Sequence, residues 1–223
     1  MPQRISKKII LYFFILLLLS TPNNKILSEI NLNKNYSFEI SSLSKFNDKE
    51  ILNDLLNYKN QNLLLLEKEK IIKTLKKYKS LEDYNLYKNY PARMIVNLKK
   101  TQFLAITQKD GVNFYVGSNG NLIKIKDKED DLPVIFGSID VVEFLKLKDL
   151  IDNSIFDFSN VKNFYYFKSK RWDIETKDGL LLKLPKDNLI KSFKLFINII
   201  NKKDLKNINI IDLRQNNQII LNG

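Results

Sequence analysis

The stretch that decides the fold reads Arg171-Trp172-Asp173-Ile174-Glu175-Thr176-Lys177-Asp178-Gly179-Leu180-Leu181-Leu182-Lys183-Leu184-Pro185. Trp172, the only tryptophan of the chain, and Ile174 alternate with acidic residues, at the two-residue period of a half-buried strand. The run 177–179 is typical of a turn, because its glycine adopts φ > 0 at little cost. Residues 180–184 then predict a return strand that the proline ends, so the stretch predicts a β-hairpin.

A helix and two short strands are predicted after the hairpin. Asp187 can cap the helix, whose apolar residues recur near helical spacing: Leu189, Ile190, Phe193, Phe196, Ile197 and Ile200. The strands are predicted at 208–213, which runs into Asp212-Leu213-Arg214, and at 218–221, with a turn at 215–217 between them. Asp212 and Arg214 lie two residues apart on one strand face, so we expect a local ion pair rather than a site.

Short strands and turns also fill the region before the hairpin. Strand candidates are residues 104–107, 112–116 and 122–125, with glycine-bearing turns at 109–111 and 118–120, and residues 164–167 lead into the hairpin. The segment Leu132-Pro133-Val134-Ile135-Phe136-Gly137 precedes a helix expected at about 141–150. The acidic run 127–131 predicts a solvated loop and not a cation site, because Ca²⁺ loops usually space their ligands and contain a glycine turn.

Residues 36–101 predict the order strand, helix, helix, strand, strand. Each helix has one apolar stripe, drawn from Ile51, Leu52, Leu55 and Leu56 in the first and Ile71, Ile72, Leu75 and Tyr78 in the second. Helices on one face of a small mixed sheet define an α+β module. The polar, asparagine-rich run 26–35 suits a linker.

The amino terminus carries Arg4, Lys7 and Lys8 ahead of an unbroken apolar run from Ile9 to Leu19. The uncharged stretch 9–24 is shorter than the ~20 residues that span a bilayer comfortably. A cleaved signal and a buried core helix are the alternatives, but no Ala-x-Ala cleavage pattern follows the run. We therefore expect a membrane anchor, formed by residues including Ile9, Leu11, Phe13, Phe14, Leu16 and Leu19. The basic flank predicts a cytoplasmic amino terminus, with the rest of the chain outside the inner membrane.

Composition restricts the chemistry that the chain can perform. Among 223 residues there is no cysteine and no histidine, which removes disulfides, thiolate metal sites and histidine-based catalysis. The glycines form no dinucleotide or phosphate loop. The net charge of +12 reflects either coding bias or a functional surface, and no arginine-rich aromatic stripe indicates nucleic acid. We expect no catalytic residue, metal, cofactor or small-molecule substrate; an exported enzyme is the weakest alternative.

Three motifs together resemble the FtsQ/DivIB cell-division family: the hairpin 171–185, the segment 132–137 and Asp212-Leu213-Arg214. The order of elements in 36–101 also resembles the POTRA module of that family. The resemblance implies an α+β chain with a cytoplasmic tail and anchor at 1–25, a linker at 26–35, a POTRA-like module at 36–101 and a β domain at 102–223. That β domain would hold a mostly antiparallel sheet and two or more helices.

The resemblance further implies a function and partners. It implies a non-catalytic divisome scaffold in the inner membrane at the division site, which binds FtsB- and FtsL-like bitopic proteins through its periplasmic domains. Another POTRA-bearing accessory, for protein transport or outer-membrane assembly, is the alternative. The hairpin 171–185 followed by Asp212-Leu213-Arg214 favours the division protein, because POTRA modules elsewhere do not need these motifs.

The last strand is the expected partner surface. Its residues lack charge and proline, which usually protect an unpaired edge: Gln218, Ile219, Ile220, Leu221, Asn222 and Gly223. A partner strand could pair with that edge, and the resemblance supports this because family members bind FtsB through their last strand. The resemblance also places Arg171 near the partner, where it would contact an acidic residue. Alternatively, Ile219 and Leu221 pack inward and water or a loop covers the edge.

Overall fold

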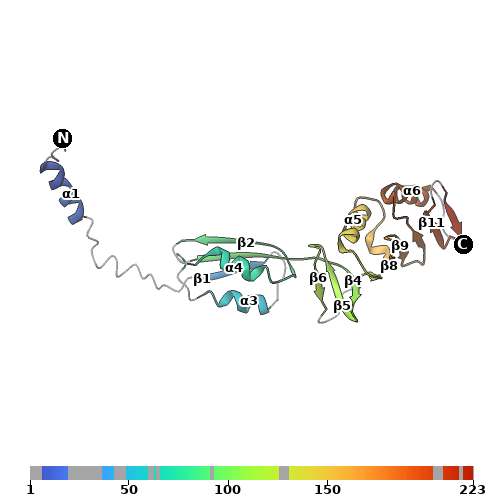
Figure 1. Ribbon diagram of the computed structural model, residues 1–223, viewed down its shortest axis with the longest axis horizontal. Helices are drawn as coiled ribbons and strands as arrows, with labels where there is room; N and C mark the ends of the chain where they lie inside the picture. The colour runs from blue at the N-terminus through green and yellow to red at the C-terminus, as the bar shows by residue number, and fades with distance from the viewer. Residues whose placement is uncertain are drawn as a thin grey trace.

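The computed structural model describes residues 7–19, 37–42, 49–59, 63, 66–90, 93–125, 131–202, 208–215 and 218–222. These residues form an α+β structure with one three-stranded and one nine-stranded sheet (Figure 1). The expected linker 26–35, most of the acidic loop and Gly223 lie outside the described residues.

The strands of the three-stranded sheet and its two helices follow one another in the chain in the predicted order. These are β1 (Ser37–Ser42), α3 (Lys49–Leu56), α4 (Lys68–Leu75), β2 (Leu81–Asn89) and β3 (Arg93–Lys100). Strand β3 lies in the middle, parallel to β1 and antiparallel to β2. A parallel pair needs a crossover connection, which the two helices lie within. Ile51 and Leu55 of α3 and Ile71 and Leu75 of α4 are fully buried in a core of their own.

The larger sheet has the strand order β12-β11-β10-β9-β8-β7-β4-β5-β6. Its strands are β4 (Phe103–Lys109), β5 (Val112–Gly117), β6 (Leu122–Lys124), β7 (Val134–Phe136), β8 (Val161–Tyr166), β9 (Trp172–Thr176), β10 (Leu181–Lys183), β11 (Ile210–Asp212) and β12 (Ile220–Asn222). Its helices are α5 (Val141–Asp152), the short 3-10 helix η1 (Phe158–Asn160) and α6 (Leu189–Lys202). Five of its eight neighbouring strand pairs are antiparallel, so the sheet is mostly antiparallel as expected.

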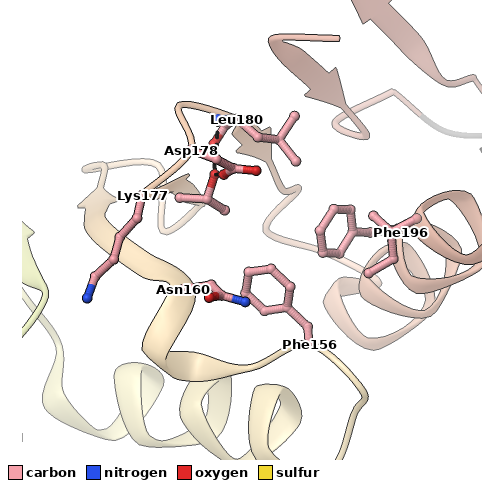
Figure 2. Close-up of a pocket in the computed structure, with 8 residues that line it drawn as sticks. Phe156, Asn160, Lys177, Asp178, Leu180 and Phe196 are labelled. Carbon is pink, nitrogen blue, oxygen red and sulfur yellow. Dashed lines mark hydrogen bonds between the residues drawn. The ribbon is translucent and has the colours of Figure 1, made fainter. Parts of the chain in front are cut away.

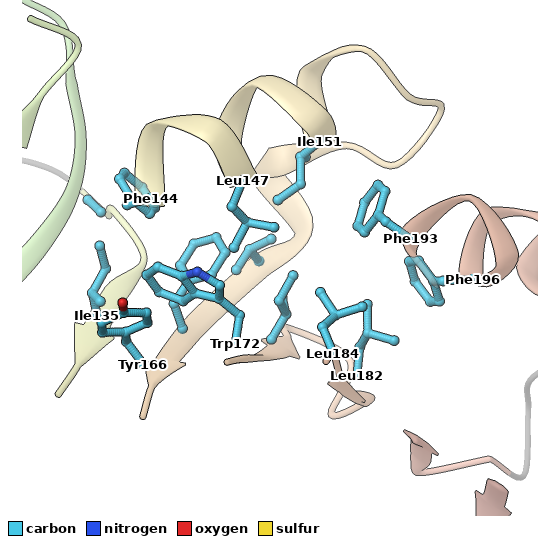
Figure 3. Close-up of a cluster of buried hydrophobic side chains, with 14 of the residues drawn as sticks. Ile135, Phe144, Leu147, Ile151, Tyr166, Trp172, Leu182, Leu184, Phe193 and Phe196 are labelled. Carbon is cyan, nitrogen blue, oxygen red and sulfur yellow. The ribbon is translucent and has the colours of Figure 1, made fainter. Parts of the chain in front are cut away.

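Two parallel pairs place both long helices on one face of this sheet. Strands β7 and β8 are parallel and joined through α5, and β10 and β11 are parallel and joined through α6. Both crossovers step in the same direction along the sheet from strands of the same orientation. Since such crossovers are right-handed, both helices belong on the same face. Figure 3 shows this, with Phe144 of α5 and Phe193 of α6 in one buried cluster. The other face of strands β8 to β11 therefore points away from both helices.

Trp172 lies at the centre of that cluster and is 2% exposed. Its ring centroid is 4.5 Å from that of Tyr166, 6.1 Å from Phe164 and 6.2 Å from Phe144 (Figure 3). Aromatic pairs at such separations add to the free energy gained by burying their area. The tryptophan of the predicted half-buried strand is thus a core residue.

Two glycines of the predicted motifs have the backbone that only glycine takes easily. Gly179 has φ +92° in the predicted hairpin turn. Gly137 has φ +103°, and a Cβ there would lie 2.0 Å from the carbonyl oxygen of Tyr166. The glycine after β7 is therefore required by the close approach of the end of β8.

Several helix and strand ends differ from the sequence predictions, two of them in the last part of the chain. The amide of Ser192 donates to the carbonyl of Asn188 at 3.0 Å, which makes Asn188 the N-cap of α6. The prediction that Asp187 caps this helix is wrong, because the helix begins one residue later. The last strand covers Ile220–Asn222 instead of 218–221, so its first two predicted residues precede it.

The apolar run at the amino terminus forms α1 (Lys7–Leu19), a helix of 13 residues. Among the described residues, no helix combines the length and the apolar character needed to cross a membrane. The expected anchor residues in the run 9–19 lie on this helix.

A hydrogen-bond network joins the two sheets at the turn between β5 and β6. The Asn119 side-chain amide donates to two backbone carbonyls at the start of β2, at 2.9 and 2.8 Å. One carboxylate oxygen of Glu82 accepts from Thr101 at 2.9 Å and from Ser118 at 2.8 Å. The start of β2 thus supplies the acceptors, while Ser118 and Asn119 of the β5–β6 turn and Thr101 supply the donors.

Candidate functional site

Strand β12 lies at the end of the nine-stranded sheet, and among the described residues its only strand neighbour is β11. Leu221 pairs with Ile211 and packs against the core. Ile220 pairs with Asp212 on the opposite face and is 45% exposed. Ile219, just before the strand, is 43% exposed. Of Ile219 and Leu221, which the alternative prediction packs inward, only Leu221 does so.

A row of polar side chains crosses the helix-free face and ends at this edge. The strand register places Tyr165 of β8 opposite Asp173 of β9, and Asp173 opposite Lys183 of β10. Lys183 in turn lies opposite Asp212 of β11, which pairs with Ile220. The row therefore leads from the middle of the sheet directly to the exposed edge strand.

Asp212 and Arg214 form the predicted local ion pair. The guanidinium Nε donates to both carboxylate oxygens, at 2.8 and 3.0 Å, and the Arg214 backbone amide donates to Oδ1 at 3.0 Å. These hydrogen bonds hold the pKa of Asp212 below its ordinary value and that of Arg214 above its own. Because the charges and hydrogen-bonding groups of Asp212 and Arg214 pair with each other, we interpret the pair as a structural element next to β12.

Arg171 lies in the turn that leads into β9. Its guanidinium carbon is 4.5 Å from the ring centroid of Phe167, a cation–π distance. Lys170, just before it, has φ +61°, which marks a tight turn. The Arg171 Nε is buried and has no acceptor within the described part of the chain.

Asp173 is a buried carboxylate two residues from Arg171. It is 6% exposed, and its Oδ1 has no hydrogen-bond donor among the described residues. Burial raises its pKa, while the charges of Arg214, Arg171 and Lys183 act in the opposite direction. An unsatisfied donor and an unsatisfied acceptor thus lie at neighbouring positions on the same side of β9, which is costly for a fold.

Glu175, the next residue on the same face, is fully satisfied by contrast. Its carboxylate accepts from Asn163 at 2.9 Å and from Tyr165 at 2.6 Å, and Lys162 lies 3.2 Å away. These contacts lower its pKa to about 2. The same hydrogen bond raises the pKa of Tyr165. This group is an ionised structural element and not a proton donor or acceptor near neutral pH.

Residues 105–214 match the family model described as "Cell division protein FtsQ/DivIB, C-terminal". The chain belongs to the FtsQ/DivIB family. This is a non-enzymatic family of cell-division proteins that functions at the division septum. The matched region begins in β4 and ends at Arg214, so it includes Arg171 and the polar row but not β12.

One solved structure is similar to part of this FtsQ/DivIB chain. It is the major extracytoplasmic domain of the trans isomer of the cell-division protein DivIB from Geobacillus stearothermophilus. The two share 13% identity over 47% of this chain and 98% of the other, with a TM-score of 0.31. A comparison with curated proteins finds no match.

A cavity of about 290 Å³ lies beneath the β9–β10 turn of this FtsQ/DivIB domain (Figure 2). Its lining residues are Phe156, Asn160, Thr176, Lys177, Asp178, Leu180, Phe196 and Ile200. The Thr176 hydroxyl donates to the Asp178 carboxylate, which is the only carboxylate in the lining. The described lining thus offers no second carboxylate beside Asp178. Among the described residues no group of three metal-ligating side chains gathers either.

The polar row of the FtsQ/DivIB sheet was not predicted from the sequence. Alternation does place Asp173 and Glu175 on the face opposite Trp172, and this was the available signal. Which residues of β8, β10 and β11 face them depends on strand pairing, which the alternation within one strand does not contain.

Proposed function

We propose that this member of the FtsQ/DivIB family is a non-catalytic scaffold of the bacterial divisome that binds other division proteins through its last strand. The observation that supports it is the outer edge of β12, with which no strand of the described residues pairs and which carries the exposed Ile220 at the end of the polar row. An edge strand without charge or proline is open to pairing with an added strand.

In this proposal a partner strand pairs with β12 through its backbone, while its side chains give specificity. The partner surface comprises Arg171 and the strand residues Gln218, Ile219, Ile220, Leu221, Asn222 and Gly223. In this proposal Arg171, whose side chain is only partly buried, contacts an acidic residue of the partner through its guanidinium. Arg171 precedes Asp173 by two residues, so strand alternation puts it on the side of β9 that the polar row crosses.

The proposed partners are FtsB- and FtsL-like bitopic proteins, which the family resemblance implies. The chain would meet them outside the inner membrane, as a single-pass protein whose anchor includes the apolar run of α1. Two lysines at the start of this helix support a cytoplasmic amino terminus. The module around β1, α3, α4, β2 and β3, which has the order of a POTRA module, would hold further division proteins.

The edge-strand proposal is tested with a matched pair of substitutions at one position. Ile219→Pro removes the side chain and a backbone N–H on the outer side of the last strand, whereas Ile219→Ala removes the side chain alone. The N–H of Ile220 faces β11 and is left intact in both variants. Each net hydrogen bond contributes about 1 kcal/mol, so the proline variant should bind the FtsB-like partner at least about fivefold more weakly than the alanine variant. Isothermal titration measures both, with circular dichroism to confirm folding. Equal affinities for folded variants would exclude pairing at this edge.

The proposed contact of Arg171 with an acidic partner residue is tested by two substitutions in the turn between β8 and β9. Arg171→Glu should weaken partner binding by about fivefold or more, since an exposed ion pair contributes up to about 1 kcal/mol and a desolvated one contributes more. Lys168→Glu is the control, because Lys168 is exposed on the same turn and changes the net charge equally. If both substitutions weaken binding equally, general electrostatics and not a specific contact explains the role of Arg171.

A further inference from the structure

A second surface lies on the helix side of the larger sheet, away from the polar row. Helix α5 and the start of α6 border a groove of about 860 Å³. Its residues on α5 recur every three or four positions, so they share one side of that helix. The groove is lined by Glu143, Lys146, Asp149, Leu150, Asn153, Lys186, Asn188, Leu189, Ile190, Lys191 and Lys194.

The two walls of the groove differ in charge. On α5, Lys146 pairs with Glu143 at 2.8 Å, and the Asn153 amide donates to the Asp149 carboxylate at 3.0 Å. The α6 wall carries three lysines at positions 186, 191 and 194, and none of them has an ion-pair partner among the described residues. The groove therefore presents positive charge that its own side chains leave uncompensated.

Apolar side chains lie beside these lysines. Leu150 and Leu189 pack partly against the core and leave their remaining surface in the groove. Ile190 is 60% exposed and lies on the same helix face as Lys194, four residues further on. A single exposed isoleucine needs no explanation, but here it adjoins two leucines in a concave site with a cationic rim. Protein interfaces have this combination of an apolar centre and a polar rim.

We propose that this groove binds an acidic amphipathic segment of a partner protein. Apolar side chains of the segment would contact Leu150, Leu189 and Ile190, and its carboxylates would pair with Lys191 and Lys194. The choice of a peptide follows from the concave apolar floor, since a flat anionic lipid surface offers nothing to fill it. This surface is separate from β12, because α5 and α6 cover the face opposite the polar row. Binding there does not depend on the proposed edge pairing.

The test uses the full chain in nanodiscs of zwitterionic lipid and a labelled synthetic peptide, followed by fluorescence anisotropy. The peptide has about 16 residues, long enough for a marginal helix, with Glu and Leu at helical spacing. Its controls are a scrambled peptide of equal composition and vesicles that contain phosphatidylglycerol. We expect the patterned peptide to bind more tightly than the scrambled one, and added salt to weaken binding.

Three variants locate the binding. Lys191→Glu with Lys194→Glu should weaken binding about tenfold. Lys73→Glu on α4 with Lys77→Glu in the turn after it changes the net charge equally at exposed positions and should have little effect. Ile190→Ser should weaken binding about threefold, which a purely electrostatic attraction would not cause. If the reversal pair fails to fold by circular dichroism, the milder Lys191→Gln with Lys194→Gln should still weaken binding.

Four results would overturn the proposal. These are equal losses for the α6 and α4 charge reversals, no effect of Ile190→Ser, equal binding of the scrambled peptide, or groove-dependent binding of the anionic vesicles without binding of the peptide. Loss of peptide binding in the α6 variants with unchanged binding of the FtsB-like partner would support two separate surfaces.

Discussion

Replacing Glu175 by glutamine should destabilise the larger sheet near neutral pH and have little effect in strong acid. The carboxylate accepts hydrogen bonds from Asn163 and Tyr165 across the β8–β9 pair and lies near Lys162. Glutamine keeps one acceptor oxygen but loses the charge that strengthens these bonds.

The magnitude follows from the lowered pKa. A fall from 4.5 to about 2 corresponds to about 3.4 kcal/mol, at about 1.36 kcal/mol for each pKa unit. Because the side chain is 22% exposed, solvent screening reduces this, and we expect a loss of about 2 kcal/mol or less. A group with a lowered pKa contributes its stability above about pH 4.5 and loses it as the pH falls through about 2. The difference between wild type and Glu175→Gln should shrink over that range.

The assay is denaturant unfolding followed by the fluorescence of Trp172, which is buried in the core of the same sheet. Stability is measured at pH 7 and at several values down to pH 2. Tyr165→Phe removes one donor but keeps the ring that stacks on Phe136 at 5.2 Å, so a double-mutant cycle isolates the hydrogen bond. Glu143→Gln is the control, because its ion pair is exposed and should contribute little.

Two results would refute the reasoning. One is a destabilisation by Glu175→Gln that is the same at pH 7 and pH 2, which would mean that packing and not ionisation is responsible. The other is additivity of Glu175→Gln and Tyr165→Phe, which would show that the two groups do not interact.

Two other substitutions test the same domain. Asp173→Asn should leave the protein as stable as wild type or more stable at pH 7, because burial raises the pKa of Asp173 and the ionised form opposes folding. The stability advantage of the variant should vanish as the pH falls and Asp173 of the wild type becomes protonated. A loss of unfolding free energy above about 1 kcal/mol in the variant at pH 7 would contradict this. Gly137→Ala should cost at least about 3 kcal/mol in thermal or denaturant unfolding, because its Cβ would meet the carbonyl of Tyr166 at a positive φ. Gly111→Ala, also at positive φ but with no atom within 4 Å, should cost about 1 kcal/mol, and equal losses would mean that the contact is unimportant.

Local signals explain why the hairpin 171–185 could be predicted. The alternation around Trp172 and the turn at Gly179 are contained within a few consecutive residues, and the structure has both. The start of α6 was missed by one residue, because Asp187 and Asn188 are equally suitable caps by type. Only the hydrogen bond from Ser192 distinguishes them.

The parallel pairs could not be predicted from the same signals. Strand β10 pairs with β11 after an intervening helix, and no short-range pattern indicates which distant strand a given strand joins. The candidate surface depends on these pairings, because they bring Lys183 opposite Asp212 and place β12 at the edge. The edge could be anticipated from the apolar end of the chain, but the charges beside it could not.

The hydrogen bonds between Asn119 and the start of β2 affect how far from the proposed membrane anchor the chain can bind a partner. A flexible joint would let the last strand sample many heights and directions, and a partner would have to overcome that freedom on binding. With Glu82, Thr101 and Ser118 also bonded across the joint, the two sheets present one geometry. If chain and partner are anchored in one membrane, such a fixed spacer raises the effective concentration of the two surfaces only for partners whose stalk matches its length. The junction between the two sheets would thus favour partners of suitable length, independently of their side-chain contacts with β12.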